Sequence, residues 1–114
     1  MPKQIVCLRD RITSGAGDNN IDFPLYGDWD IIAIEVRYDG TNPCLLAVSL
    51  EPDTEAPLWA SVSALGIKSG FCNTRHNLTW NGRIPTSGNA KIRATTSAAE
   101  AGHAFNVTVV LEKR

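Results

Sequence analysis

The sequence predicts an all-β protein, an antiparallel β-sandwich or barrel of about eight short strands. Three observations predict this class. Short runs carry apolar residues at alternate positions, turn-forming residues recur about every ten positions, and no long stretch has the 3.6-residue period of an amphipathic helix. Strands without intervening helices favour antiparallel packing. At 114 residues, the chain is predicted to form a single domain over residues 1–114.

The clearest alternation lies between Asp30 and Leu50. In the first run, alternate apolar residues are predicted to share one face: Ile32, Ile34, Val36 and Tyr38. A second run has the same spacing: Cys44, Leu46, Val48 and Leu50. The turn-forming stretch from Asp39 to Pro43 separates the two runs. We therefore predict a β-hairpin with one buried face in this region.

The segments before this hairpin are less regular. Residues Gln4 to Ile12 form a predicted strand, and Thr13 to Asn20 is rich in Gly, Ser, Asp and Asn, which indicates a loop. The short strand from Ile21 to Leu25 contains Pro24, which restricts it to a sheet edge or a bulge. A turn at 26–28 then leads into the hairpin.

After the hairpin, the stretch from Leu58 to Leu65 fits both strand and helix patterns, and we favour a strand or irregular structure. Further strands are predicted at Ile67–Cys72, His76–Trp80, Ala90–Thr96 and Ala104–Glu112. Turns are predicted at Asn81-Gly82 and in residues 86–89, and one helical turn at 98–101. In the last strand, alternate residues are predicted to be buried: Phe105, Val107, Val109 and Leu111.

Composition excludes several function classes. The formal net charge is −1 and the isoelectric point is near 6.1, so no global field attracts nucleic acid or an anionic membrane. No apolar run approaches the ~20 residues of a membrane-spanning helix. The amino-terminal residues lack the apolar core and cleavage site of a signal peptide. We therefore expect synthesis in the cytoplasm.

The three cysteines are Cys7, Cys44 and Cys72, and no pair has metal-ligand or CxxC spacing. The favoured interpretation is three small buried apolar residues in a reducing compartment. The alternative is one disulfide and one remaining thiol.

Charge is unevenly distributed along the chain. Residues 18–55 carry nine acids and one base, whereas residues 56–114 carry seven bases and two acids. Folding either interleaves these charges or leaves an acidic and a basic region that bind one another between copies. For the second case, we select acidic and basic interface candidates: Glu51, Asp53, Glu55, Arg83 and Arg93.

No local motif indicates catalysis or a cofactor. The two histidines, His76 and His103, are at ligand spacing neither from each other nor from a cysteine, and no nucleophile elbow is present. Asp18, Asn20 and Asp22 begin like an EF-hand loop, but Phe23 occupies the glycine position. We therefore expect no enzymatic activity, no cofactor and no metal, with a calcium site in this loop as the alternative.

The three tryptophans are Trp29, Trp59 and Trp80. A tryptophan buries a large apolar area and needs one polar partner, so core or interface packing is the favoured interpretation. The alternative is a sugar-stacking platform. Trp29 lies between two aspartates at a strand entrance and is expected to be the most exposed of the three.

Four sequence features resemble small bacteriophage virion proteins with a jelly-roll or related sandwich: residues 30–34 (DIIAI), the Trp80-Asn81-Gly82 turn, residues 91–95 (KIRAT) and residues 101–105 (AGHAF). The resemblance covers the chain from about Asp30 to its end. It is one of general composition and pattern, with short strands and turns rich in Thr, Ser and Asn. It implies a jelly-roll-like sandwich that decorates or cements a capsid, or sits on a spike, and reinforces subunit junctions.

These observations lead to one main functional hypothesis. We expect a non-enzymatic virion structural protein that binds other proteins, both copies of itself and a larger capsid shell, with a trimer as the favoured homo-oligomer. The terminal strand from Ala104 to Glu112 supports assembly, because it carries one charge and no proline, and a neighbouring strand or a second subunit must cover it. The alternative is a small lectin-like sandwich that binds carbohydrate through Trp29 or Trp59.

Overall fold

The structure is a computed structural model that describes residues 4–13, 17–41, 44–52, 65–86, 89–99 and 102–114. Within these ranges the chain forms eight strands and no helix. The strands are β1 (Ile5–Thr13), β2 (Gly17–Tyr26), β3 (Trp29–Tyr38), β4 (Cys44–Pro52), β5 (Leu65–Cys72), β6 (Leu78–Thr86), β7 (Asn89–Ala99) and β8 (Ala104–Lys113). No helix in the described part of the chain has the length and apolarity to span a membrane.

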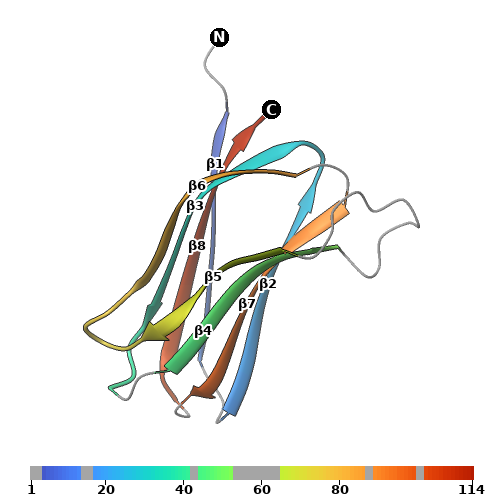
Figure 1. Cartoon of the computed structure of the whole chain (residues 1–114). Coiled ribbons are helices and arrows are strands. Elements are labelled where there is room, and N and C mark those ends of the chain that lie inside the picture. Colours follow the sequence, from blue (N-terminus) through green and yellow to red (C-terminus); the bar gives the residue numbers. More distant parts are fainter. Residues whose placement is uncertain (1–3, 14–16, 42–43, 53–64, 87–88, 100–101) are drawn as a thin grey trace.

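The strands form two four-stranded antiparallel sheets that pack face to face (Figure 1). The first sheet has the order β1-β8-β3-β6 and the second has the order β2-β7-β4-β5. The chain changes sheets at every connection except the one from β4 to β5. This order is that of a jelly roll with two Greek keys. The prediction of an all-β, jelly-roll-like sandwich is therefore confirmed.

The core lies between the two sheets and follows the predicted alternation in β4 and β8. The four predicted residues of β4 are at most 3% exposed, and those of β8 at most 2%. Residues on the opposite phase of β8, such as Thr108, are only partly buried. Burying apolar surface stabilises the folded state by about 25 cal/mol per Å² removed from water. Burial of one face of each strand is therefore the main interaction that holds the two sheets together.

The predicted hairpin between Asp30 and Leu50 is wrong. Strand β3 pairs with β6 and β8, whereas β4 pairs with β5 and β7 in the opposite sheet. The alternation of apolar residues correctly identified the buried face of β4 and, from Ile34 onward, that of β3. It carries no information on which strand lies alongside. Here the chain crosses from one sheet to the other after Tyr38, so both runs face the same core from opposite sides.

A β-bulge changes the phase of β3. The register with both neighbours shifts between Ile31 and Ala33, so Ile31 and Ile34 are both buried while Ile32 is partly exposed. The sequence prediction placed Ile32 in the core because it assumed uninterrupted alternation. A bulge inserts one extra residue into one strand of a pair and reverses the faces beyond it.

The strands at the sheet edges agree in part with expectation. Strand β2 is an edge strand and Pro24 is exposed, as the proline predicted. Strand β8 lies between β1 and β3, so neighbours within the same chain cover both of its sides. This strand therefore gives no support for a second subunit. Among the described strands, the edge strands are β1 and β6 in the first sheet and β2 and β5 in the second.

Other boundaries also differ from the sequence prediction. The predicted loop at 13–20 ends early, because β2 begins at Gly17. Strand β6 continues through the expected Asn81-Gly82 turn, and β7 extends to Ala99 where a helical turn was expected. The turn at 26–28 is confirmed by Gly27, whose φ of 91° favours glycine. Most of the ambiguous stretch from Leu58 to Leu65 lies outside the described residues.

Candidate functional site

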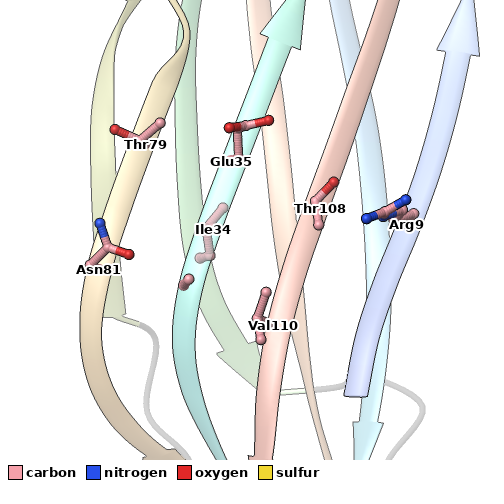
Figure 2. A pocket seen from close by; sticks show the side chains of 8 residues that line it. Arg9, Ile34, Glu35, Thr79, Asn81, Thr108 and Val110 are labelled. Carbon is pink, nitrogen blue, oxygen red and sulfur yellow. The ribbon is translucent and has the colours of Figure 1, made fainter. Parts of the chain in front are cut away.

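The outer face of the β1-β8-β3-β6 sheet carries a row of polar side chains. Arg9, Thr108, Glu35 and Thr79 are register partners across all four strands. Asn81 lies two residues along β6, opposite Ala33. Figure 2 shows these polar side chains spread across the sheet, with Val110 further down the strand that carries Thr108. Together they line a shallow depression of about 330 Å³.

This depression, which we call the Arg9 depression, presents both hydrogen-bond donors and acceptors. Glu35 accepts a hydrogen bond from Arg37 at 2.7 Å, and both side chains are well exposed. Arg9 is exposed, and it belongs to none of the ion pairs that join described residues. A second depression of about 450 Å³ continues past Arg37 to Asn106. No local sequence motif indicated this surface, because it combines single residues from four strands.

Arg83, an interface candidate, belongs to an ion-pair network at one end of the same sheet. Its Nη1 donates to Oδ2 of Asp30 at 2.5 Å and contacts Oε1 of Glu112 at 3.3 Å. Arg114 approaches the other Asp30 oxygen at 3.4 Å and donates to the Thr86 carbonyl oxygen at 2.5 Å. Because the Asp30 side chain is only 6% exposed, the two guanidinium groups compensate a buried carboxylate.

Arg93 and Glu51, two further candidates, pair within the chain on the outer face of the other sheet. Arg93 donates two hydrogen bonds to Asp22, at 2.8 and 3.1 Å, and lies 3.4 Å from Glu51. The hydrogen bond from Arg93 lowers the pKa of Asp22, and burial opposes this effect. The acidic and basic parts of the sequence are thus interleaved by folding at this site. Asp53 and Glu55 lie outside the described residues.

The pairing of Asp22 also bears on the calcium alternative. Both carboxylate oxygens of Asp22 accept hydrogen bonds from Arg93, and the side chain of Asp18 lies outside the described part of the structure. Asn20 is exposed on β2. Among the described residues, no group of three or more His, Cys, Asp or Glu side chains has an arrangement that could hold a metal ion.

Two of the three tryptophans are partly buried against the core. The Trp29 indole nitrogen donates to the Tyr26 carbonyl oxygen at 2.8 Å, and the Lys113 ammonium lies 4.8 Å from the centre of its ring. Trp80 packs along its own strand over Gly82, where an added Cβ would lie 2.6 Å from the indole. Both rings therefore have partners within the chain. Trp59 lies outside the described residues.

The histidines are in ordinary surface positions. His103 lies 3.1 Å from the Asp39 carboxylate, which also accepts a hydrogen bond from the Ala104 amide at 2.8 Å. The Asp39 side chain is 58% exposed, so this pair is not enclosed in a cleft. His76 is exposed and bridges to Asn73 through the backbone.

A pair of exposed apolar side chains marks the edge of the second sheet. Leu45 on β4 and Phe71 on β5 are directly opposite in register and are 41% and 67% exposed. A depression of about 290 Å³ follows along the same two strands, next to Ala47 and Ser69. We call this surface the Phe71 corner. The sequence interpretation missed it, because Phe71 is adjacent to the buried Cys72 and lies in a run without clear alternation.

Comparison with known proteins gives a likeness in fold. No family model matches the sequence, and no curated protein matches it. Among solved structures, the chain is similar to part of a chain in the "Structure of infectious bursal disease virus Gx strain", with a TM-score of 0.49 and 13% identity. The match covers 98% of this chain and 36% of that chain, so this chain spans about a third of the viral chain's length.

Proposed function

We propose that the chain is a non-enzymatic structural protein of a virion that acts through protein–protein contacts, as a capsid decoration or cement protein or beside a spike. The jelly-roll strand order supports this class, because viral capsid domains are among the proteins that use it. The same order occurs in lectin domains, so the fold supports the proposal by analogy and a surface feature must carry it. A bacteriophage source belongs to the same proposal and rests on the resemblance in sequence texture.

The Phe71 corner is the observation that carries the proposal. A phenylalanine side chain contributes strongly to interfaces through its apolar area, and here it is two-thirds exposed beside an exposed leucine. Among the described strands, β5 pairs with β4 only, so its other side is an edge of the sheet at the same place. Docking of a second protein at this corner would remove the aromatic ring from water and cover the edge of the strand.

The three charged candidates that the structure describes favour an apolar contact over a charged one. Arg83, Arg93 and Glu51 are engaged in ion pairs within the chain, so an intermolecular pair would have to break an existing one. Exposed ion pairs also contribute little to affinity. We therefore expect apolar burial at the Phe71 corner to supply most of the affinity, in a homo-oligomer for which a trimer is favoured.

Light scattering on size-exclusion fractions tests this proposal. The wild type is expected to have more than the monomer mass, and Phe71→Ser is expected to lower it while leaving the circular dichroism spectrum unchanged. Tyr26→Ser is the matched control, because Tyr26 is also aromatic, 62% exposed and on the other edge strand of the same sheet. A high salt concentration should not dissociate the oligomer, because salt screens charges and strengthens apolar contacts.

Two results would contradict the proposal at different levels. A monomer at every concentration refutes the homo-oligomer, and an oligomer that Phe71→Ser leaves intact refutes the assigned corner. The virion role is tested by co-sedimentation with particles of the virus that encodes the chain. We expect wild type and Tyr26→Ser to enter the particle fraction and Phe71→Ser to remain in the supernatant, and absence of the wild type from particles refutes the role.

The Arg9 depression supports carbohydrate binding as the second candidate function. Sugars bind to shallow surfaces through hydroxyl groups, and Glu35, Thr79 and Asn81 offer donors and acceptors around the small apolar residue Ala33. Trp29 and Trp80 already have partners within the chain, so we prefer this depression to those two tryptophans as the sugar site. A glycan array separates the two functions: binding by the wild type that Asn81→Ala abolishes favours the lectin, and binding to no glycan removes it.

A further inference from the structure

Two buried thiols face each other at the open end of the β4–β5 hairpin. Cys44 is the first residue of β4 and Cys72 is the last residue of β5, and the two are register partners. They are 0% and 1% exposed, so both side chains point into the core from the same face of the sheet. The third cysteine, Cys7, is exposed on β1 in the other sheet. The structure thus corrects the sequence expectation that all three are buried.

The register places Cys44 and Cys72 within bonding reach. Directly opposed residues on antiparallel strands have Cα atoms about 4.5 or 5.5 Å apart, according to the kind of pair. A disulfide accepts a Cα separation of about 4.4–6.8 Å, so either kind of pair fits without a change of strand position. The thiols also influence one another. Burial raises the pKa of Cys72 to about 12, and a smaller part of this rise comes from the charge of Cys44.

We propose that Cys44 and Cys72 are a site of reversible oxidation, at which a thiol–disulfide oxidant such as oxidised glutathione forms a cross-strand disulfide. One cysteine thiolate attacks a sulfur of oxidised glutathione, which forms a mixed disulfide and releases one reduced glutathione. The second thiolate attacks the protein sulfur of this mixed disulfide and releases the second glutathione. The two protons lost by the protein end on the two glutathione thiols, and the two electrons pass to glutathione.

The position in the fold gives this bond a consequence. Strands β4 and β5 are consecutive in the chain, which joins them at the Pro52 and Leu65 ends. The disulfide would join their opposite ends, next to Phe71 at the edge of the sheet. An edge strand opens more readily than a central one, and this opening is how the oxidant reaches the buried thiols. The new bond closes a loop of roughly 30 residues, which corresponds to a several-hundredfold decrease in the unfolding equilibrium constant.

The experiment uses the Cys7→Ser protein, so that the exposed thiol cannot form mixed disulfides. The protein is incubated with oxidised glutathione in urea just below its unfolding transition, where opening of β5 is frequent. We expect the intact mass to fall by about 2 Da, for the two hydrogens that leave. Peptide mapping should link Cys44 to Cys72. After removal of the oxidant, the oxidised protein should require more urea to unfold and should keep the β-rich circular dichroism spectrum.

The control is Cys72→Ala in the same Cys7→Ser background, which leaves Cys44 without its opposing thiol. This control is expected to gain a glutathione adduct or to keep its mass, and never to lose two hydrogens. The proposal is overturned if the Cys7→Ser protein acquires only glutathione adducts or keeps its reduced mass. This outcome does not depend on whether the alanine variant folds. An oxidised form that unfolds at lower urea than the reduced form also overturns it, because the bond would then distort the native register.

Discussion

Replacing the buried carboxylate of Asp30 tests whether the network at the end of β3 holds the sandwich together. In Asp30→Asn the side chain keeps its shape but loses its charge. One of the two carboxylate oxygens becomes an NH2 group, which donates and so cannot bond to a guanidinium that also only donates. A hydrogen bond to a charged group contributes about 1.5–3 kcal/mol. Asp30 has one at 2.5 Å from Arg83 and an ion pair at 3.4 Å with Arg114. We therefore expect a loss of about 2–3 kcal/mol, since the partly exposed arginines can turn to water.

Asp22 provides the matched control on the other sheet. It also pairs with an arginine across two strands, but its side chain is 38% exposed against 6% for Asp30. Exposed pairs contribute about 0.2–1 kcal/mol. With a urea dependence of about 1–1.5 kcal/mol per M, Asp30→Asn should lower the unfolding midpoint by roughly 2 M, and Asp22→Asn by less than about 1 M.

The assay is urea unfolding followed by tryptophan fluorescence and by circular dichroism. Equal losses for Asp30→Asn and Asp22→Asn would refute the argument, because burial would then not decide the energy of the pair. A double mutant adds a second check. Arg83→Met alone leaves Asp30 buried with one cation, so Arg83→Met combined with Asp30→Asn should destabilise by less than the sum of the single changes.

Three further predictions concern the core, the close packing and the thiols. Val107→Asp should abolish the folded circular dichroism spectrum, because it buries an unpaired charge, whereas Thr108→Asp on the outer face should stay folded; equal damage would show that a partner covers this face. Gly40→Ala should cost about 1–3 kcal/mol in urea unfolding, because its Cβ would overlap a buried tyrosine ring, whereas Gly66→Ala meets no atom within 4 Å and should be neutral. Burial raises the pKa of Cys72 to about 12 from the ordinary value of 9.0, so at pH 9–12 the thiol loses its proton more readily in the unfolded chain. The free energy of unfolding should therefore be unaffected by this thiol below pH 9 and should fall by up to about 1.4 kcal/mol per pH unit between pH 9 and 12. The Cys72→Ala variant should lack this part of the decline.

For β4 and β8, the sequence was sufficient to identify which face of the strand is buried. Alternation is a local property of a strand, so the buried faces of β4 and β8 follow from a few consecutive residues. The failure at Ile32 has a local cause as well. Residues 31–34 are all apolar, so either phase fits, and only the partner strands show that a bulge separates Ile31 from Ala33.

The neighbours of each strand could not be predicted in the same way. The turn-like stretch after Tyr38 suggested a hairpin, yet a connection between sheets uses the same residue types. The Arg9 depression shows the same limit, because Arg9 and Thr108 come from opposite ends of the chain and become neighbours only through the pairing of β1 with β8. The ion pairs Asp30–Arg83 and Asp22–Arg93 also depend on strand pairing, because their partners are 53 and 71 positions apart in the sequence.

Arg93→Glu shows how this internal pairing changes a test of assembly. The substitution places a third carboxylate beside Asp22 and Glu51, so like charges repel within the chain before any partner is considered. We expect a lower melting temperature at low salt and partial recovery at high salt, because these side chains are partly exposed and salt screens them. Light scattering of the folded fraction should give the wild-type mass, because the Phe71 corner is unchanged. A lower mass with an unchanged melting temperature would instead place Arg93 in an intermolecular contact and contradict the assignment of the interface to Phe71.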